Sequence, residues 1–128
     1  MRRTPSDEAG RWFLQAQRDL DDARYSAAGQ RFNLACFLAQ QSAEKALKAL
    51  LYFAGAEAVW GHSVAELCQD IIAIHPDLAP LAAIGGPLDK YYIPTRYPNG
   101  LPGGIPSDAL VSADAQMAIS MAEQVLDT

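Results

Sequence analysis

Residues 31–53, RFNLACFLAQQSAEKALKALLYF, constrain the fold of this chain more than any other segment. The stretch contains no Gly or Pro, and it is rich in Ala and Leu, which favour helices. When residues are placed at steps of ~100°, apolar side chains cover two sides of the predicted helix. We therefore expect neighbours on both sides and a central place in the fold. The two apolar sets are Phe32, Cys36, Ala39, Ala43, Leu47, Leu50 and Ala54, and Leu34, Ala35, Leu38, Ala46, Ala49 and Phe53.

The remaining sector of this helix is polar and carries Gln41, Glu44, Lys45 and Lys48. Glu44 and Lys48 have the i, i+4 spacing at which an exposed helix ion pair contributes ~0.3–0.5 kcal/mol. One interpretation is therefore a solvated, salt-bridged face. The other is a functional cluster, because a helix that neighbours cover on most sides has few freely solvated positions.

Other helices are predicted around this one. Apolar residues recur at intervals of three and four over residues 7–28, and Ser6 is the expected N-cap. Gly29 then allows a tight reversal, so the first two helices should be antiparallel neighbours. Further helices are predicted for residues 63–74, 78–92 and 107–126.

Local signals place the ends of these later helices. Ser63 and Glu66 match a capping box, and Ser107-Asp108 is the expected cap of the last helix. Gly85-Gly86-Pro87 should interrupt or kink the segment 78–92. No stretch alternates apolar and polar residues as a strand does. The sequence thus predicts an all-α fold, an antiparallel bundle of four to five helices in one domain spanning residues 1–128.

Charge and composition limit the functions to consider. The net charge of −5 argues against a broad basic surface for duplex nucleic acid, although a few convergent cations could still form a local anion site. No apolar run approaches the roughly 18–20 residues that span a bilayer, and the N-terminus lacks the apolar core of a signal peptide. We expect a cytoplasmic protein. Cys36 and Cys68 are expected to be small buried residues.

The segment from Tyr91 to Pro98 is the second candidate for function. Arg96 lies between two prolines and close to Tyr92 and Tyr97. An arginine fork suits phosphate, and a tyrosine ring suits a base. Alternatively, the tyrosines pack the segment onto the bundle while Arg96 pairs with a carboxylate such as Glu44. The spacing does not decide between these two interpretations.

His62 precedes the helix predicted for residues 63–74, where a histidine is usually structural. No second His, Cys or carboxylate stands at metal-ligand spacing from it, so no metal site is expected. The chain also has no phosphate-cradling Gly-rich loop and no HExxH motif. We expect no cofactor.

Four segments together resemble the HEPN (higher eukaryotes and prokaryotes nucleotide-binding) domain family, in the family's order and over nearly the whole chain. The strings FLAQQSAEKALK and YYIPTRYP are specific as a pair. These segments are residues 18–23 (RDLDDA), 37–48 (FLAQQSAEKALK), 62–64 (HSV) and 91–98 (YYIPTRYP).

The resemblance implies an antiparallel helical bundle, commonly a homodimer, that associates with nucleotides or RNA. It also implies a small nucleotidyltransferase partner in a toxin–antitoxin-like pair. Many members are metal-independent ribonucleases that carry, near the last helix, an Arg and a His separated by a spacer of about four to six residues. Here no His follows His75. The residue that would activate the ribose 2′-hydroxyl or protonate the leaving group is therefore missing.

We accordingly expect a HEPN protein that binds a nucleotide or RNA phosphate without the usual ribonuclease motif. One alternative is a metal-independent ribonuclease with a non-standard acid–base residue such as His62. Another is a protein-interaction module that engages the nucleotidyltransferase. From the family's motifs, we expect Lys45, Lys48 and Arg96 to contact phosphate, and Tyr92 or Tyr97 to stack on a base. Gln41 and Glu44 are expected to orient these groups, and His62 is expected to close the rim of the binding pocket.

Overall fold

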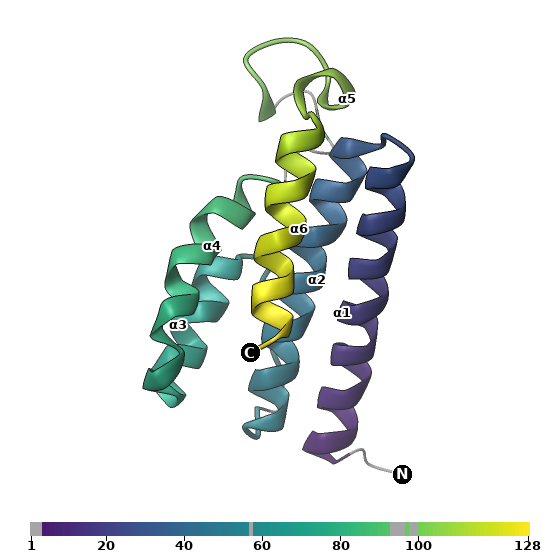
Figure 1. The fold of residues 1–128 in the computed structure, drawn as a ribbon. Helices are drawn as coiled ribbons and strands as arrows, with labels where there is room; N and C mark the ends of the chain where they lie inside the picture. Colours follow the sequence, from purple (N-terminus) through teal and green to yellow (C-terminus); the bar gives the residue numbers. More distant parts are fainter. Residues whose placement is uncertain (1–3, 57, 93–96, 98–99) are drawn as a thin grey trace.

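The computed structural model describes residues 4–56, 58–92, 97 and 100–128, which form helices and connecting segments without a strand. The predicted all-α bundle is confirmed, with five α-helices of at least eight residues in this part of the chain (Figure 1). The elements are α1 (Pro5–Ala28), α2 (Phe32–Phe53), α3 (Val64–Ile74), the 3-10 helix η1 (Pro76–Leu81), α4 (Ala82–Asp89), α5 (Pro106–Ala109) and α6 (Ser112–Leu126).

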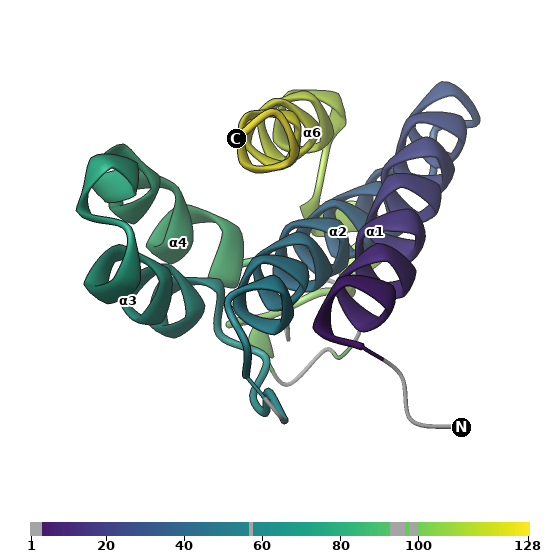
Figure 2. The same ribbon diagram turned by 90° about the horizontal axis from the view of Figure 1, so that it is seen from below.

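Helix α2 is the centre of the bundle, as its two apolar sides predict. It packs against α1, α3 and α6, and Figure 2 shows it between α1 on one side and the α3–α4 pair on the other. Burial removes apolar side chains from water at roughly 25 cal/mol per Å², which stabilises this arrangement. The fully buried α2 residues include Ala35, Cys36, Ala39, Ala43 and Leu47.

The ends of α1 differ in detail from the prediction. Thr4, and not Ser6, is the N-cap: its hydroxyl accepts a hydrogen bond from the Asp7 backbone N–H at 3.1 Å. Pro5 then occupies the first helical turn, where its missing N–H costs nothing. In the reversal into α2, the left-handed backbone conformation falls on Gln30 (φ 62°), while Gly29 has φ −86°.

The third helix begins at the predicted N-cap, Ser63, whose hydroxyl accepts from the Glu66 N–H. Of the predicted capping box, this is the one bond present among the described residues. Asp89, at the end of α4, completes this cap by accepting from the backbone N–H groups of Val64 and Ala65. The α3 N-terminus is thereby fixed to α4, because a carboxylate at a helix N-terminus satisfies free donors and favours the helix dipole.

The segment predicted as one kinked helix over residues 78–92 is instead η1 followed by α4. The 3-10 helix passes directly into the α-helix between Leu81 and Ala82, and Gly85-Gly86-Pro87 lies inside α4. Gly85 is required because α3 and α4 approach closely: a Cβ atom on Gly85 would lie 2.5 Å from Ala65 Cα. This glycine therefore serves packing between helices and not a kink.

The last predicted helix is also divided. Helix α5 ends at Ala109, Leu110 and Val111 are extended, and α6 begins at Ser112. The Asp114 carboxylate accepts the Val111 N–H at 2.9 Å, so Asp114 supports the start of α6 in place of Ser107-Asp108. Among the helices described, none is both long and apolar enough to cross a bilayer.

Both cysteines are buried and unpaired, as expected from the sequence. Burial, with a smaller contribution from Asp114, raises the pKa of Cys36 to about 12. Burial, with a smaller contribution from Asp89, raises the pKa of Cys68 to about 11. Both thiols therefore stay protonated near neutral pH, where a thiol is a poor nucleophile.

Candidate functional site

The polar sector of α2 is largely covered by α1 and by the segment before α3: Glu44 and Lys48 are buried, and Gln41 and Lys45 are partly buried. Glu44 Oε1 lies 3.1 Å from Lys48 Nζ, and the side chains of Glu44 and Lys48 are only 3% and 7% exposed. A solvated surface pair, one of the two interpretations of the spacing, is therefore wrong. Both charges have lost water, so each depends on the other and on additional hydrogen bonds.

Glu44 is the centre of these additional bonds. Its Oε1 atom also lies 2.8 Å from His62 Nδ1, and its Oε2 atom accepts from Gln41 Nε2 at 2.8 Å. Gln41 donates in addition to Gln40 Oε1, and Gln40 Nε2 donates to the His62 carbonyl at 3.0 Å. Every buried side-chain nitrogen and oxygen in the described residues has a partner. The network thus fixes the segment before α3 onto α2.

His62 differs from the rest of this network because its side chain is 61% exposed. An ionised carboxylate only accepts hydrogen bonds, so Nδ1 carries the proton in its bond to Glu44. Within the described residues, Nε2 makes no other hydrogen bond. The ring is oriented by a buried carboxylate while it remains open to solvent, an arrangement that suits ligand binding or proton transfer.

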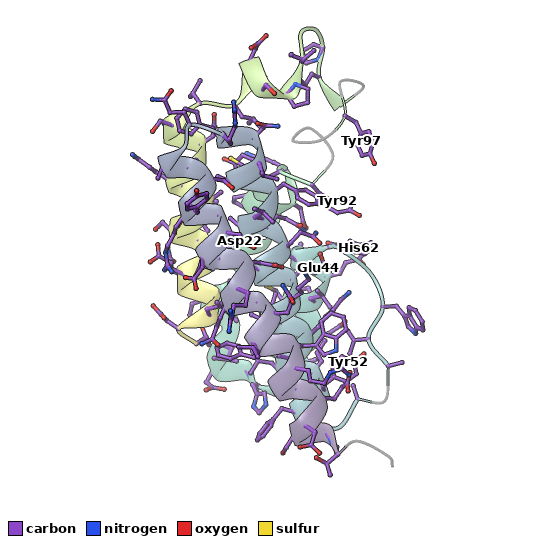
Figure 3. All side chains as sticks on the ribbon, turned by 90° about the vertical axis from the view of Figure 1, so that its right-hand side faces the viewer. Asp22, Glu44, Tyr52, His62, Tyr92 and Tyr97 are labelled. Atoms are coloured by element: carbon purple, nitrogen blue, oxygen red, sulfur yellow. The ribbon has the colours of Figure 1, made fainter. Side chains whose placement is uncertain are left out.

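An aromatic stack supports the His62 ring. The ring centroids of His62 and Tyr92 are 5.4 Å apart with planes 14° apart, and Tyr92 also stacks with Phe37 at 6.1 Å. Figure 3 shows Glu44, His62 and Tyr92 close together on one side of the bundle. Since Tyr92 already stacks with two rings, the exposed His62 ring is the more open surface for a base.

A second ion pair lies beside the first, between Lys45 of α2 and Asp19 of α1. Asp19 is 7% exposed and Lys45 is 26% exposed. Gln15 donates to the other Asp19 oxygen at 2.8 Å, so the carboxylate is satisfied on both sides. Lys45 therefore belongs to an α1–α2 contact, and part of its side chain still reaches solvent.

Trp12 of α1 contacts Lys48, which lies at the end of the network away from His62. Lys48 Nζ lies 5.3 Å from the centre of the Trp12 ring, within the range of a cation–π interaction. Trp12 also stacks on Tyr52 of α2, with ring centroids 5.7 Å apart. The Trp12 ring thus covers the Lys48 ammonium, whose side chain is only 7% exposed.

The structure brings together five of the eight predicted site residues: Gln41, Glu44, Lys48, His62 and Tyr92. Lys45 is adjacent but is held by Asp19. Tyr97 is exposed and lies beyond Tyr92 in Figure 3, and Arg96 lies outside the described residues. No cluster of three His, Cys, Asp or Glu side chains that could hold a metal ion occurs in the part of the chain that the structure describes.

The sequence reasoning missed three partners in this site, and each is a side chain from an unexpected position. Trp12 and Asp19 come from α1, and Gln40 is the fully buried neighbour of Gln41. A signal for Asp19 was present, because it lies between Ala16 and Ala23 at the spacing of the apolar stripe of α1. An acid in such a stripe must find a buried partner.

Comparisons with known proteins place this arrangement in a family. The crystal structure of TT1696 from Thermus thermophilus is similar to this chain with a TM-score of 0.88 and 37% sequence identity, covering 94% of each chain. The crystal structure of ST0689, an archaeal HEPN homologue, is similar with a TM-score of 0.77 and 38% identity, covering 99% of this chain and 94% of that one. A comparison with curated protein sequences found no match.

The model of the HEPN domain family matches residues 9–128, which include both ion pairs, His62 and the Tyr91–Pro98 segment. The match therefore extends over all of the segments that carried the resemblance in the sequence. The chain belongs to the HEPN domain family.

Proposed function

We propose that this HEPN-domain protein binds a nucleotide or the phosphates of RNA at the face that carries His62. The single observation that supports this most is the exposed His62 ring, held by the buried Glu44 and backed by Tyr92. A planar ring fixed in this way offers a base a stacking surface that needs little further ordering.

The cations near this ring would take the phosphates. Lys45 is partly exposed and can turn from Asp19 toward an anion, whereas Lys48 is enclosed by Glu44 and Trp12. Lys48 would act at a distance, by keeping the Glu44 carboxylate oriented toward His62. Arg96 and Tyr97 remain candidates for phosphate and base contacts on the strength of the family motif.

Association with other chains is part of the same proposal. From the family, we propose a homodimer that works with a small nucleotidyltransferase partner in a toxin–antitoxin-like pair in the cytoplasm. A purely protein-interacting role is the competing proposal, and it predicts that the partner binds while nucleotides do not.

Calorimetric titration of ATP, GTP and a short single-stranded RNA tests the binding proposal. We expect at least one of these ligands to bind with a dissociation constant below the millimolar range. Base–aromatic stacking contributes ~1–3 kcal/mol, so His62→Ala should weaken binding about tenfold or more. The matched control is His75→Ala, because His75 is exposed and lies at the far end of α3. No binding by the wild type would refute the proposal.

A metal-independent ribonuclease remains a second candidate because of one specific observation, the Glu44–His62 hydrogen bond of 2.8 Å. A carboxylate that orients an imidazole in this way is a frequent element of general acid–base catalysis. Incubating the same wild-type and variant proteins with RNA and a chelator tests whether the protein cleaves RNA without a metal. Cleavage that His62→Ala abolishes and His75→Ala preserves would identify an enzyme.

A further inference from the structure

A groove on the outer side of α1 is lined mostly by residues outside the predicted nucleotide site, with Lys45 as the residue that the two share. It has a volume of about 550 Å³ and is formed mainly by one face of α1, with one residue from α2. Its lining residues are Arg11, Trp12, Leu14, Gln15, Arg18 and Lys45.

The polar residues of this groove follow a helical repeat. Arg11, Gln15 and Arg18 are separated by four and three positions, so they lie on one face of α1 along ~10 Å of the helix. Lys45 reaches the same groove from α2. Three cationic side chains therefore line one groove of a protein whose net charge is −5.

These cations differ in how firmly they are held. Arg18 is exposed and forms no hydrogen bond or ion pair with the residues that the structure describes. Arg11 pairs with Glu8 at 3.1 Å, but solvent reaches both side chains and the pair contributes little. Asp19 is buried behind Lys45 and has both oxygens occupied, so it is the Lys45 ammonium that extends toward solvent. An incoming phosphate would thus meet positive charge at three positions.

A chain of side-chain contacts connects the groove with His62. Trp12 lines the groove and contacts Lys48, Lys48 pairs with Glu44, and Glu44 binds His62. Figure 3 shows Tyr52, Glu44, His62 and Tyr92 in succession along α2 and its neighbours. Lys45, which lines the groove, is the sequence neighbour of Glu44, which binds His62, so an oligonucleotide that stacks on the His62 ring could reach the groove across this part of α2.

We propose that the groove lined by Arg11, Arg18 and Lys45 binds the backbone phosphates of a single-stranded RNA whose base stacks on His62. This inference rests on the proposed function and narrows its ligand to an oligonucleotide. A single strand fits because narrow cationic grooves beside aromatic platforms are typical of such sites. A duplex would need a broad basic surface, which an acidic protein does not offer.

The length dependence of binding tests this inference. Fluorescence anisotropy is measured with labelled single-stranded RNAs of one, two, four and eight nucleotides, at 50 and 200 mM salt. For the wild type, we expect affinity to rise at least tenfold between one and eight nucleotides. The double variant Arg11→Gln/Arg18→Gln should remove this gain and leave mononucleotide binding unchanged. It should also reduce the slope of log affinity against log salt concentration by about one to two, because fewer counterions are released. Circular dichroism should show an unchanged fold, because both arginines are exposed.

Arg24→Gln is the matched control, since Arg24 is an exposed arginine of α1 that pairs with Asp21 and Glu123 outside the groove. It should bind all lengths as the wild type does. Equal affinity at all lengths, or equal weakening by Arg24→Gln, would overturn the groove assignment while mononucleotide binding still supports the proposed function. Competition by polyglutamate as effective as by RNA would assign the groove to an acidic peptide and also overturn it. Failure of every RNA and mononucleotide to bind overturns both proposals.

Discussion

Asp19 and Glu44 are two buried carboxylates that pair with lysines of α2, and they differ in what surrounds the pair. Asp19 holds Lys45, whose side chain is 26% exposed, and it is supported by Gln15. Glu44 holds Lys48, whose side chain is 7% exposed and lies against the Trp12 ring. The first pair therefore has a route to water, and the second has almost none.

This difference separates a lysine that can turn toward a ligand from a buried network that orients an exposed ring. Asp19 and Lys45 connect α1 to α2, and the lysine can leave the carboxylate at modest cost. Glu44 instead connects Lys48 to the exposed His62 and to Gln41, so that buried charge orients a solvent-facing ring. The Glu44 network is therefore where stability and function should be most tightly coupled.

Of the variants that test this comparison, Glu44→Gln should lose the most stability. The variant leaves the Lys48 ammonium buried without a counter-charge, which costs ~3–5 kcal/mol of unfolding free energy. Urea unfolding followed by circular dichroism measures the loss. Glu123→Gln is the control and should change stability by less than about 0.5 kcal/mol, because Glu123 pairs with Arg24 at the exposed surface.

A double variant shows whether the buried charge is the cause. In Glu44→Gln/Lys48→Met the ammonium is gone, so much of the stability lost in Glu44→Gln should return. A single variant that loses less than about 1 kcal/mol would contradict the buried pair and would favour a solvated face.

Asp19→Asn should have a smaller effect. Lys45 can turn toward water and the Gln15 contact can remain, so we expect a loss of ~1–3 kcal/mol, which is the range for a buried group with one partner removed. The same urea titration measures it, with the exposed Asp22→Asn as the control. A loss equal to that of Glu44→Gln would show that the two pairs do not differ as their exposure indicates.

The sequence predicted the bundle because the pattern that decides it is local. Residues 31–53 carry apolar side chains on two sides, and this alone places α2 at the centre. The burial of Glu44 and Lys48 was not predictable in the same way. Their i, i+4 spacing is shared by many exposed pairs, and it is Trp12, from another helix, that excludes water from Lys48.

Two other kinds of feature were not predicted from the sequence: some of the helix caps, and contacts between residues far apart in the chain. Thr4 and Asp114 provide caps in place of those expected from Ser6 and from Ser107-Asp108, and Asp89 adds a second cap to the one that Ser63 provides. Asp89 reaches the α3 N-terminus from 25 residues away in sequence, at the Val64 N–H. Such contacts follow from how helices pack, and spacing along one helix does not encode them.

His62→Ala should have the smallest effect on stability and the largest effect on binding. The side chain is 61% exposed and donates one hydrogen bond to Glu44, so its removal should cost only ~0.5–1.5 kcal/mol. Urea unfolding of His62→Ala beside Glu44→Gln measures the difference. If His62→Ala is as destabilising as Glu44→Gln, the ring is a structural member of the network, and the loss of RNA binding would then report misfolding. If it unfolds almost as the wild type does, a tenfold loss of affinity is attributable to the exposed ring itself.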